Sequence, residues 1–451
     1  MISTPICDFV QHYAESNPAR FHMPGHKGAG PLGCEARDIT EIDIADDLYA
    51  PKGVIAQSEA NASRLFGARS FYSTEGSSLA IRAMLALALR GATGNQRPLV
   101  LAGRNAHRAF LSAAALLDFD VQWLSPAPGD AYHSCRVDAT DVEAALDALG
   151  GRCRAVYLTS PDYLGHTCDI AAISEVCRRR GALLLVDNAH GAYLRFLPGG
   201  SRHPISLGAD LCCDSAHKTL PALTGAAYLH LNPRLGTALR LGASPAQVRQ
   251  AMAMFGSSSP SWLILQSLDA CNRYLDTFSR VLTGFLPKLD ALKAELTAHG
   301  YALVGDEPMK LTLSARPFGY TGDALAEALM AAGVFCEFHD PDHVVLMPTP
   351  QNTDADLERL KSALLSLSRR PALAQDAPAY RAPKAALSIR EAAFAPRETL
   401  PARQCEGRVL AAPALSCPPC VPVAVCGEVI DADVIERLLY YGIDACDVVA
   451  R

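Results

Sequence analysis

No apolar run in the sequence reaches the ~18 residues that a membrane-spanning helix requires. The best candidate, residues 83–89, is bounded by Arg82 and Arg90. An excess of basic residues is also lacking, because 41 Lys and Arg face 47 Asp and Glu for a net charge of −6. The N-terminus has no basic segment followed by an apolar one, so we expect no secretory signal. These absences argue against a membrane partner and against a general nucleic-acid binder.

The composition shows neither the pattern of a disordered chain nor that of a disulfide scaffold. The 451 residues are 49% hydrophobic and 20% charged, which is typical of globular proteins. The 15 cysteines are odd in number and scattered through a long chain, unlike those of a small disulfide-rich domain. Cys212 and Cys213 lie in an apolar run and predict core thiols. We therefore expect a cytoplasmic protein of two or three lobes.

Short apolar strands alternate with amphipathic helices from about residue 70. The predicted strands are 99–101, 121–124, 155–158, 182–186, 211–213 and 226–231, and the predicted helices are 79–89, 106–117, 141–149 and 171–180. This alternation predicts an α/β fold with a mostly parallel sheet covered on both faces. Ligands of such sheets bind at the carboxyl ends of the strands, so we expect the chemistry there.

The flanking regions have other patterns. Residues 1–50 look irregular, and 262–299 predict a long helical stretch that links two lobes. A small α+β domain is expected from strands at 311–313, 334–335 and 344–347 and helices at 324–332 and 354–367. The Pro/Ala-rich stretch 370–385 predicts a linker. We divide the chain into an N-terminal segment (1–50), a large domain (51–290), a small α+β domain (291–370) and a C-terminal tail domain (371–451).

Two residues at predicted strand ends suggest pyridoxal chemistry. Lys218 follows the strand at 211–213 among small and hydroxyl residues, where an amine can reach an aldehyde. Asp187 ends the strand at 182–186, where a carboxylate can keep a pyridine nitrogen protonated. Alone, Lys218 reads equally as a solvated loop lysine and Asp187 as a helix cap.

Further loops at the same predicted edge add to this pattern. Ser77 and Ser78 precede the helix at 79–89, where free amides and the helix dipole favour an anion such as phosphate. His107 follows the strand at 99–101 and can stack on a flat ring, although a histidine near a helix start is common. The turn at 159–165 follows the strand at 155–158. The ordered combination is more specific than any single loop.

Together these segments resemble a fold-type-I pyridoxal-phosphate enzyme. The segments Phe-His-Met-Pro-Gly-His-Lys-Gly (21–28), Asp-Leu-Tyr-Ala-Pro-Lys-Gly (47–53), Asp-Asn-Ala-His-Gly (187–191) and Ser-Ala-His-Lys-Thr-Leu-Pro (215–221) resemble the short form of the Orn/Lys/Arg decarboxylase family. The resemblance implies a transferase-like large domain with a smaller α+β C-terminal domain. It also implies pyridoxal 5'-phosphate, no metal, and a homodimer or higher oligomer with shared active sites.

The resemblance also implies roles for individual residues. Lys218 forms the Schiff base. The loss of carbon dioxide gives a quinonoid, and its Cα is then protonated by Lys218, our first choice, or by a nearby histidine. Asp187 pairs with the ring nitrogen, and His107 stacks on the ring. The residues implied at the phosphate are Ser77, Ser78, Ser215 and His217. His190, which we place one helical turn after Asp187, is implied near the ring hydroxyl or the substrate carboxylate.

The implied reaction is decarboxylation of arginine, lysine or ornithine to a polyamine-pathway amine. The cation at the far end of such a substrate needs an acidic partner, for which Glu337, Asp46 and Asp47 are candidates. Two alternatives stay open. One is another fold-type-I enzyme, an aminotransferase or aldolase, and the other is a non-catalytic paralogue.

The chain departs from the family pattern at a few places. Asn188 stands where an acid is expected, and Tyr193 where histidine is frequent. The tail reads Cys-Pro-Pro-Cys-Val-Pro at 417–422 in place of Tyr-Pro-Pro-Gly-Ile-Pro. Cys417 and Cys420 have a metal-like spacing that Cys405 and Cys426 could join, but we expect ordinary buried thiols.

Overall fold

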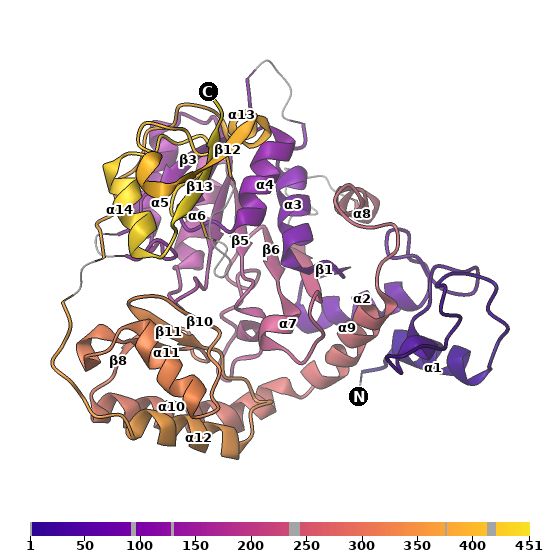
Figure 1. Cartoon of the computed structure of the whole chain (residues 1–451). Coiled ribbons are helices and arrows are strands. Elements are labelled where there is room, and N and C mark those ends of the chain that lie inside the picture. Colours follow the sequence, from indigo (N-terminus) through magenta and orange to yellow (C-terminus); the bar gives the residue numbers. More distant parts are fainter. Residues whose placement is uncertain (1, 92–95, 128–129, 234–243, 375–376, 413–420) are drawn as a thin grey trace. The chain divides into compact units, whose positions relative to one another are not determined.

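The computed structural model describes residues 2–91, 96–127, 130–233, 244–374, 377–412 and 421–451 (Figure 1). The chain forms two compact units. Unit 1 consists of residues 1–93 and 183–282, and unit 2 consists of residues 94–182 and 283–451. Among the described residues, every helix is too short or too polar to cross a bilayer.

Unit 1 contains four strands that explain the apolar runs of the sequence. They are β1 (Arg69–Ser73), β5 (Leu183–Asp187), β6 (Leu211–Asp214) and β7 (Ala227–Leu231). Their order is β1-β7-β6-β5, with β5 and β6 parallel and β7 antiparallel to both of its neighbours. Every residue of β5, β6 and β7 is buried, which requires side chains that are apolar on both faces. Cys212 and Cys213 are core thiols, as predicted.

The helices of unit 1 surround these strands. They are α1 (Pro5–Glu15), α2 (Val54–Phe66), α3 (Gly76–Ala88), α7 (Ala216–Thr219), α8 (Pro245–Ala253) and α9 (Trp262–Leu275), with 3₁₀ turns at Glu35–Arg37 and Ala192–Phe196. Helix α3 packs against β6, β7 and α8, and helices α1, α2 and α9 pack on one another. Because α3 begins at Gly76, Ser77 and Ser78 lie inside its first turn, and Glu75 occupies the capping position.

One expectation for unit 1 is wrong. Residues 1–50 are not irregular throughout, because α1 forms there with Pro5 at a first-turn position, where its missing amide costs nothing. The helical stretch expected over 262–299 is present and is divided into two helices, α9 and α10 (Phe278–His299). The amide of Thr277 bonds the carbonyl of Tyr274, a tighter turn that ends α9 without a glycine or proline to mark the end.

The first part of unit 2 follows the predicted alternation. Its strands β2 (Leu99–Gly103), β3 (Asp120–Leu124) and β4 (Cys153–Thr159) are parallel, in the order β4-β2-β3. Its helices are α4 (Arg108–Leu117), α5 (Ala139–Ala148) and α6 (Ile170–Arg180). With the strands of unit 1, this confirms an α/β fold whose strands are mostly parallel.

A small antiparallel sheet follows in unit 2. Its strands are β8 (Ala302–Val304), β9 (Leu311–Ser314), β10 (Phe338–His339) and β11 (His343–Leu346), in the order β10-β11-β9-β8, and a 3₁₀ turn covers Arg316–Phe318. Helix α11 (Gly322–Ala331) packs on β11 and on α12 (Asp354–Leu365) (Figure 1). The strand expected at 334–335 is wrong, because the amides of Gly333 and Val334 close the end of α11 instead.

The tail adds α13 (Ile389–Phe394), β12 (Arg397–Pro401), a 3₁₀ turn at Ala402–Gln404, α14 (Ala432–Tyr440) and β13 (Ala445–Val449). Strands β12 and β13 form an antiparallel pair. Cys405 and Cys426 are buried free thiols that donate to backbone carbonyls. Cys417 and Cys420 lie outside the described residues.

Candidate active site

The carboxyl ends of the parallel strands β5 and β6 bring the central residues of the predicted site into one region. Asp187 is the last residue of β5 and is only 2% exposed. Its Oδ1 accepts a hydrogen bond from the amide of Ala189 (3.1 Å) and one from the thiol of Cys213 (3.6 Å). A carboxylate held this way is fixed in orientation.

Lys218 and His190 form a direct pair. The Lys218 Nζ lies 3.1 Å from Nε2 of His190. Lys218 is on the short helix α7, which directly follows β6, and His190 lies in the turn after β5. His190 is not one helical turn after Asp187, because the carbonyl of Asn188 accepts from the amide of Gly191 and closes a turn there (2.8 Å). The two nitrogens are close enough to exchange a proton.

Three of the four residues predicted at a phosphate have contacts that fit an anion site. The hydroxyl of Ser215 donates to the hydroxyl of Ser77 (2.8 Å), in the first turn of α3, where Ser78 also lies. The ring of His217 is oriented by a bond from Nδ1 to the carbonyl of Ala226 (2.9 Å). Hydroxyl groups at a helix N-terminus are a donor set suited to phosphate.

A glycine lies close to these serines at the start of α3. Gly225 accepts a hydrogen bond from the amide of Gly76 (2.8 Å), at the start of α3. Its φ of +97° favours glycine, and a Cβ there would lie 3.0 Å from the carbonyl oxygen of Thr74. The approach of this loop to α3 therefore depends on the missing side chain.

Next to these residues lies a buried hydrogen-bond network that the sequence did not predict. Oδ2 of Asp214, the last residue of β6, accepts from Nε2 of His203 (3.0 Å) and Nε2 of His230 (3.1 Å), and Oδ1 accepts from the side-chain amide of Asn188 (2.6 Å). All four residues are fully buried. Burial opposes the charged form of Asp214, but the two imidazoles outweigh it and hold the pKa of the carboxyl below its usual range.

Asn188 departs from the family pattern, and this network gives its side chain a structural role. Asn188 directly follows Asp187, so its bond to Asp214 ties the end of β5 to the end of β6. The sequence feature that could have indicated this network is Asp214, which directly precedes the Ser215–Lys218 segment. His203 and His230 carried no comparable signal.

The remaining predicted residues are placed separately. His107, in unit 2, precedes α4 and accepts the amide of Ala109 on Nδ1 (3.1 Å), so it caps that helix. Asp46, in unit 1, accepts amides from Lys52 (2.8 Å), Gly53 (2.9 Å) and Ile55 (2.8 Å) and caps α2. Glu337, in unit 2, is exposed and accepts the hydroxyl of Tyr163 (3.0 Å).

Comparison with known proteins agrees with this arrangement. A family profile described as "Orn/Lys/Arg decarboxylase, major domain" matches residues 4–284. An arginine decarboxylase of Halalkalibacterium halodurans is 29% identical, with 95% of this chain and 91% of that protein covered. An arginine decarboxylase of Bacillus subtilis is 27% identical, with 95% of this chain and 91% of that protein covered.

The fold has a counterpart among solved structures. The constitutive lysine decarboxylase of E. coli superposes with a TM-score of 0.76 at 17% identity, covering 100% of this chain and 82% of that chain. This likeness confirms the fold-type-I architecture. With the profile covering more than half of its length, the chain belongs to the Orn/Lys/Arg decarboxylase family, and it is a decarboxylase.

Proposed function

We propose that this chain decarboxylates arginine with pyridoxal 5'-phosphate bound in unit 1. The observation that carries the proposal is the Lys218–His190 pair at 3.1 Å, at the strand end that also holds the buried Asp187. Arginine is chosen over lysine and ornithine because the two relatives described above, each aligned over 91% of its length, are named arginine decarboxylases.

The donor set of unit 1 fits the cofactor. Ser77, Ser78, Ser215 and His217 would hold its phosphate at the start of α3. When bound, the cofactor's pyridine ring takes up the electron pair left on Cα as carbon dioxide leaves.

The residues of this chain then act on protons and on orientation. Asp187 would keep the ring nitrogen protonated, and its burial strengthens that charge interaction. Lys218 would carry the aldehyde carbon and afterwards deliver a proton to Cα, with His190 as the group that exchanges a proton with it. From the family resemblance we retain His107 as the residue that stacks on the ring.

We assign the distal guanidinium of the substrate to Glu337 rather than to Asp46. Both carboxylate oxygens of Asp46 accept backbone amides at the start of α2, so few lone pairs are left for a ligand. The carboxylate of Glu337 is exposed and accepts a hydrogen bond from the hydroxyl of Tyr163, which orients it. An oriented carboxylate can accept two bonds from a guanidinium.

We further propose a cytoplasmic homodimer or larger oligomer that serves polyamine biosynthesis. The N-terminal segment exposes a group of large apolar side chains, namely Phe21 (97% exposed), Met23 (64%), Leu32 (82%) and Ile44 (66%). Several large apolar side chains exposed within one segment favour contact with another chain. The thirteen described cysteines are free, which suits a reducing compartment. Sedimentation is expected to give at least twice the chain mass of 48.0 kDa.

The deciding experiment is product analysis on purified protein loaded with pyridoxal phosphate. Arginine, lysine and ornithine are offered separately, and agmatine, cadaverine and putrescine are measured. Agmatine should dominate, Lys218→Ala should form none, and Asp187→Asn should lose about 100-fold or more of kcat, the scale of a lost proton-holding group. Cadaverine or putrescine as the main product would reassign the substrate. No amine from any of the three would overturn the proposal.

A further inference from the structure

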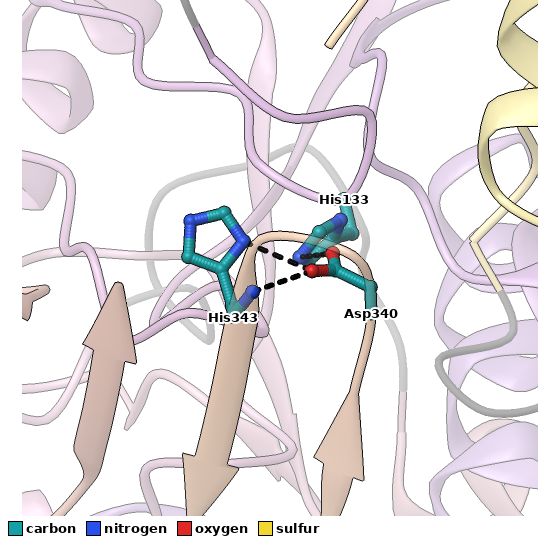
Figure 2. A group of neighbouring side chains, drawn as sticks. All are labelled: His133, Asp340 and His343. Atoms are coloured by element: carbon teal, nitrogen blue, oxygen red, sulfur yellow. Dashed lines mark hydrogen bonds and ion pairs between the residues drawn. The ribbon is translucent and has the colours of Figure 1, made fainter. Parts of the chain in front are cut away.

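A second group of buried histidine and aspartate side chains lies in unit 2. His133, from the segment between β3 and α5, faces the turn of the β10–β11 hairpin, which carries Asp340 and His343 (Figure 2). One ligand atom from each of the three residues lies within 4.8 Å of the other two. All three residues are buried. The proposed decarboxylation makes no use of them.

The hairpin turn accounts for only one oxygen of Asp340. Oδ1 accepts the amides of Asp342 (2.8 Å) and His343 (2.7 Å), which fixes the turn, and Nδ1 of the His343 ring lies 3.3 Å from it. Oδ2 has no hydrogen-bond partner among the described residues and lies 3.5 Å from Nε2 of His133. A fixed carboxylate therefore presents a buried oxygen toward the imidazole of His133.

The ring of His133 is unusual for a buried histidine. It is fully buried, and neither of its ring nitrogens has a hydrogen-bond partner within the described part of the chain. The rings of Tyr132, Tyr163 and Phe338 surround it, so the neighbourhood offers little polar compensation. An imidazole whose two nitrogens lack hydrogen-bond partners among the described residues can offer one of them to a metal ion.

We propose that His133, Asp340 and His343 bind a divalent transition-metal ion, with Zn²⁺ the best match. Two imidazoles and one carboxylate are a common three-residue set for this ion. A bound ion would satisfy Oδ2 of Asp340 and one nitrogen of each histidine. It would also join the segment around His133 to the small sheet.

The fourth ligand position has an evident source. His343 also lines a cavity of about 480 Å³ in the same unit, together with Ser134, His166 and Asp342. Water from this cavity can reach the ion beside His343. The site is therefore expected to hold three protein ligands and one water.

The His203–Asp214–His230 network differs, because its carboxylate is paired on both oxygens. There both imidazoles bond Oδ2 of Asp214, the other oxygen accepts from Asn188, and Ser70 bonds Nδ1 of His230 (2.8 Å). Both carboxylate oxygens have partners, so that network requires no ion. The His133 group differs because the carboxylate oxygen and the imidazole that face each other lack them.

The test measures metal binding and not activity. Full-length protein loaded with pyridoxal phosphate is stripped with a chelator, incubated with Zn²⁺ or Co²⁺, and freed of unbound metal. The expected results are one Zn²⁺ per chain by elemental analysis, and a visible Co²⁺ spectrum of a four-coordinate site without thiolate charge transfer. His133→Phe, which suits the aromatic surroundings, and Asp340→Asn, which keeps Oδ1 for the turn, should each weaken Zn²⁺ binding by at least about 100-fold.

The matched control is His339→Gln. His339 lies on the same hairpin but is exposed and pairs with Asp323, so its loss should leave Zn²⁺ binding unchanged. Zn²⁺ should also raise the Tm of the wild-type protein and not that of His133→Phe. If a variant fails to fold, X-ray absorption of the wild-type zinc complex decides, with two imidazoles and no sulfur expected. No stoichiometric metal, sulfur ligation, or equal binding by His133→Phe would overturn the proposal.

Discussion

At the scale of single residues, this chain keeps charged groups inside its core by surrounding them with donors. Asp214 is fully buried and would be costly alone, but three side chains donate to its two oxygens. Asp187 is stabilised in the same way by an amide and a thiol that donate to its carboxylate. The rigid carboxylate of Asp214 holds Asn188 and so steadies the chain directly after Asp187.

Replacing His230 by Gln is expected to reduce the loss of stability in acid. Burial lowers the pKa of His230 below its usual 6.5, so the folded protein keeps this ring neutral where the unfolded chain takes up a proton. The unfolded state then binds more protons, and the free energy of unfolding falls as the pH drops below about 6.5. Urea unfolding at pH 7 and pH 5 should show a smaller difference for His230→Gln than for the wild type.

Two features sharpen this measurement. Asp214, whose pKa is lowered, adds a separate loss of stability below its usual 3.8, so the comparison stays above pH 5. His339→Gln, at an exposed position, should keep the wild-type pH dependence. Equal pH dependence in His230→Gln and wild type would contradict the assignment, even if the variant is less stable at both pH values.

At the scale of elements, one side chain of α9 holds the N-terminal helices in place. Oδ2 of Asp269 accepts the amides of Ile6 (2.9 Å) and Cys7 (3.0 Å) at the start of α1, and Oδ1 accepts the hydroxyl of Ser58 on α2 (2.5 Å). Thr4, in the capping position of α1, gives its hydroxyl to Asp8 instead (3.0 Å). A residue more than 250 positions away therefore caps α1.

Replacing Asp269 by Ala is expected to lower the free energy of unfolding by about 2–4 kcal/mol. Three donors, two of them amides of a helix start, lose their acceptor in a buried site. Urea unfolding measures the loss, and limited proteolysis should cut the N-terminal segment faster than in the wild type. Asp290→Ala, at an exposed position on α10, is the control and should change neither result. Unchanged proteolysis in Asp269→Ala would argue against this role.

At the scale of the whole molecule, the two proposed ligands belong to different units. The residues proposed to hold the phosphate and Lys218 lie in unit 1, and the proposed metal ligands lie in unit 2. Each ligand stabilises the fold that binds it, by an amount set by its concentration relative to Kd. Their effects can be separated by variants that remove one ligand at a time.

Pyridoxal phosphate is expected to raise the Tm of the chain. At 100 times Kd the stabilisation is about 2.7 kcal/mol, which corresponds to roughly 3 °C for a chain of 451 residues that unfolds in one step. Lys218→Ala should lose most of this shift, whereas His133→Phe should keep it, and differential scanning fluorimetry with and without the cofactor measures both. A full shift in Lys218→Ala would show that the cofactor binds without the proposed covalent link.

Local patterns were enough for much of this molecule. The apolar runs that became β5, β6 and β7 predicted buried strands, and parallel strand ends predicted where Asp187 and Lys218 would gather. These inferences hold because a buried strand is recognisable from a run of consecutive apolar residues. The break between α9 and α10 escaped, since no glycine or proline marks it and a single backbone bond makes the turn.

The contacts that the sequence did not reveal join residues far apart in the chain. His133 meets Asp340, Asp269 caps α1, and His203 and His230 converge on Asp214 only after the chain has folded. Each of these residues is an ordinary polar residue by itself, and the sequence around it does not identify its distant partner. The sequence thus determined most of the buried strands and the family, and it indicated the lysine and aspartate that we propose for the active site. Only the tertiary structure decided which buried polar groups are paired, because packing brings together residues that lie far apart along the chain.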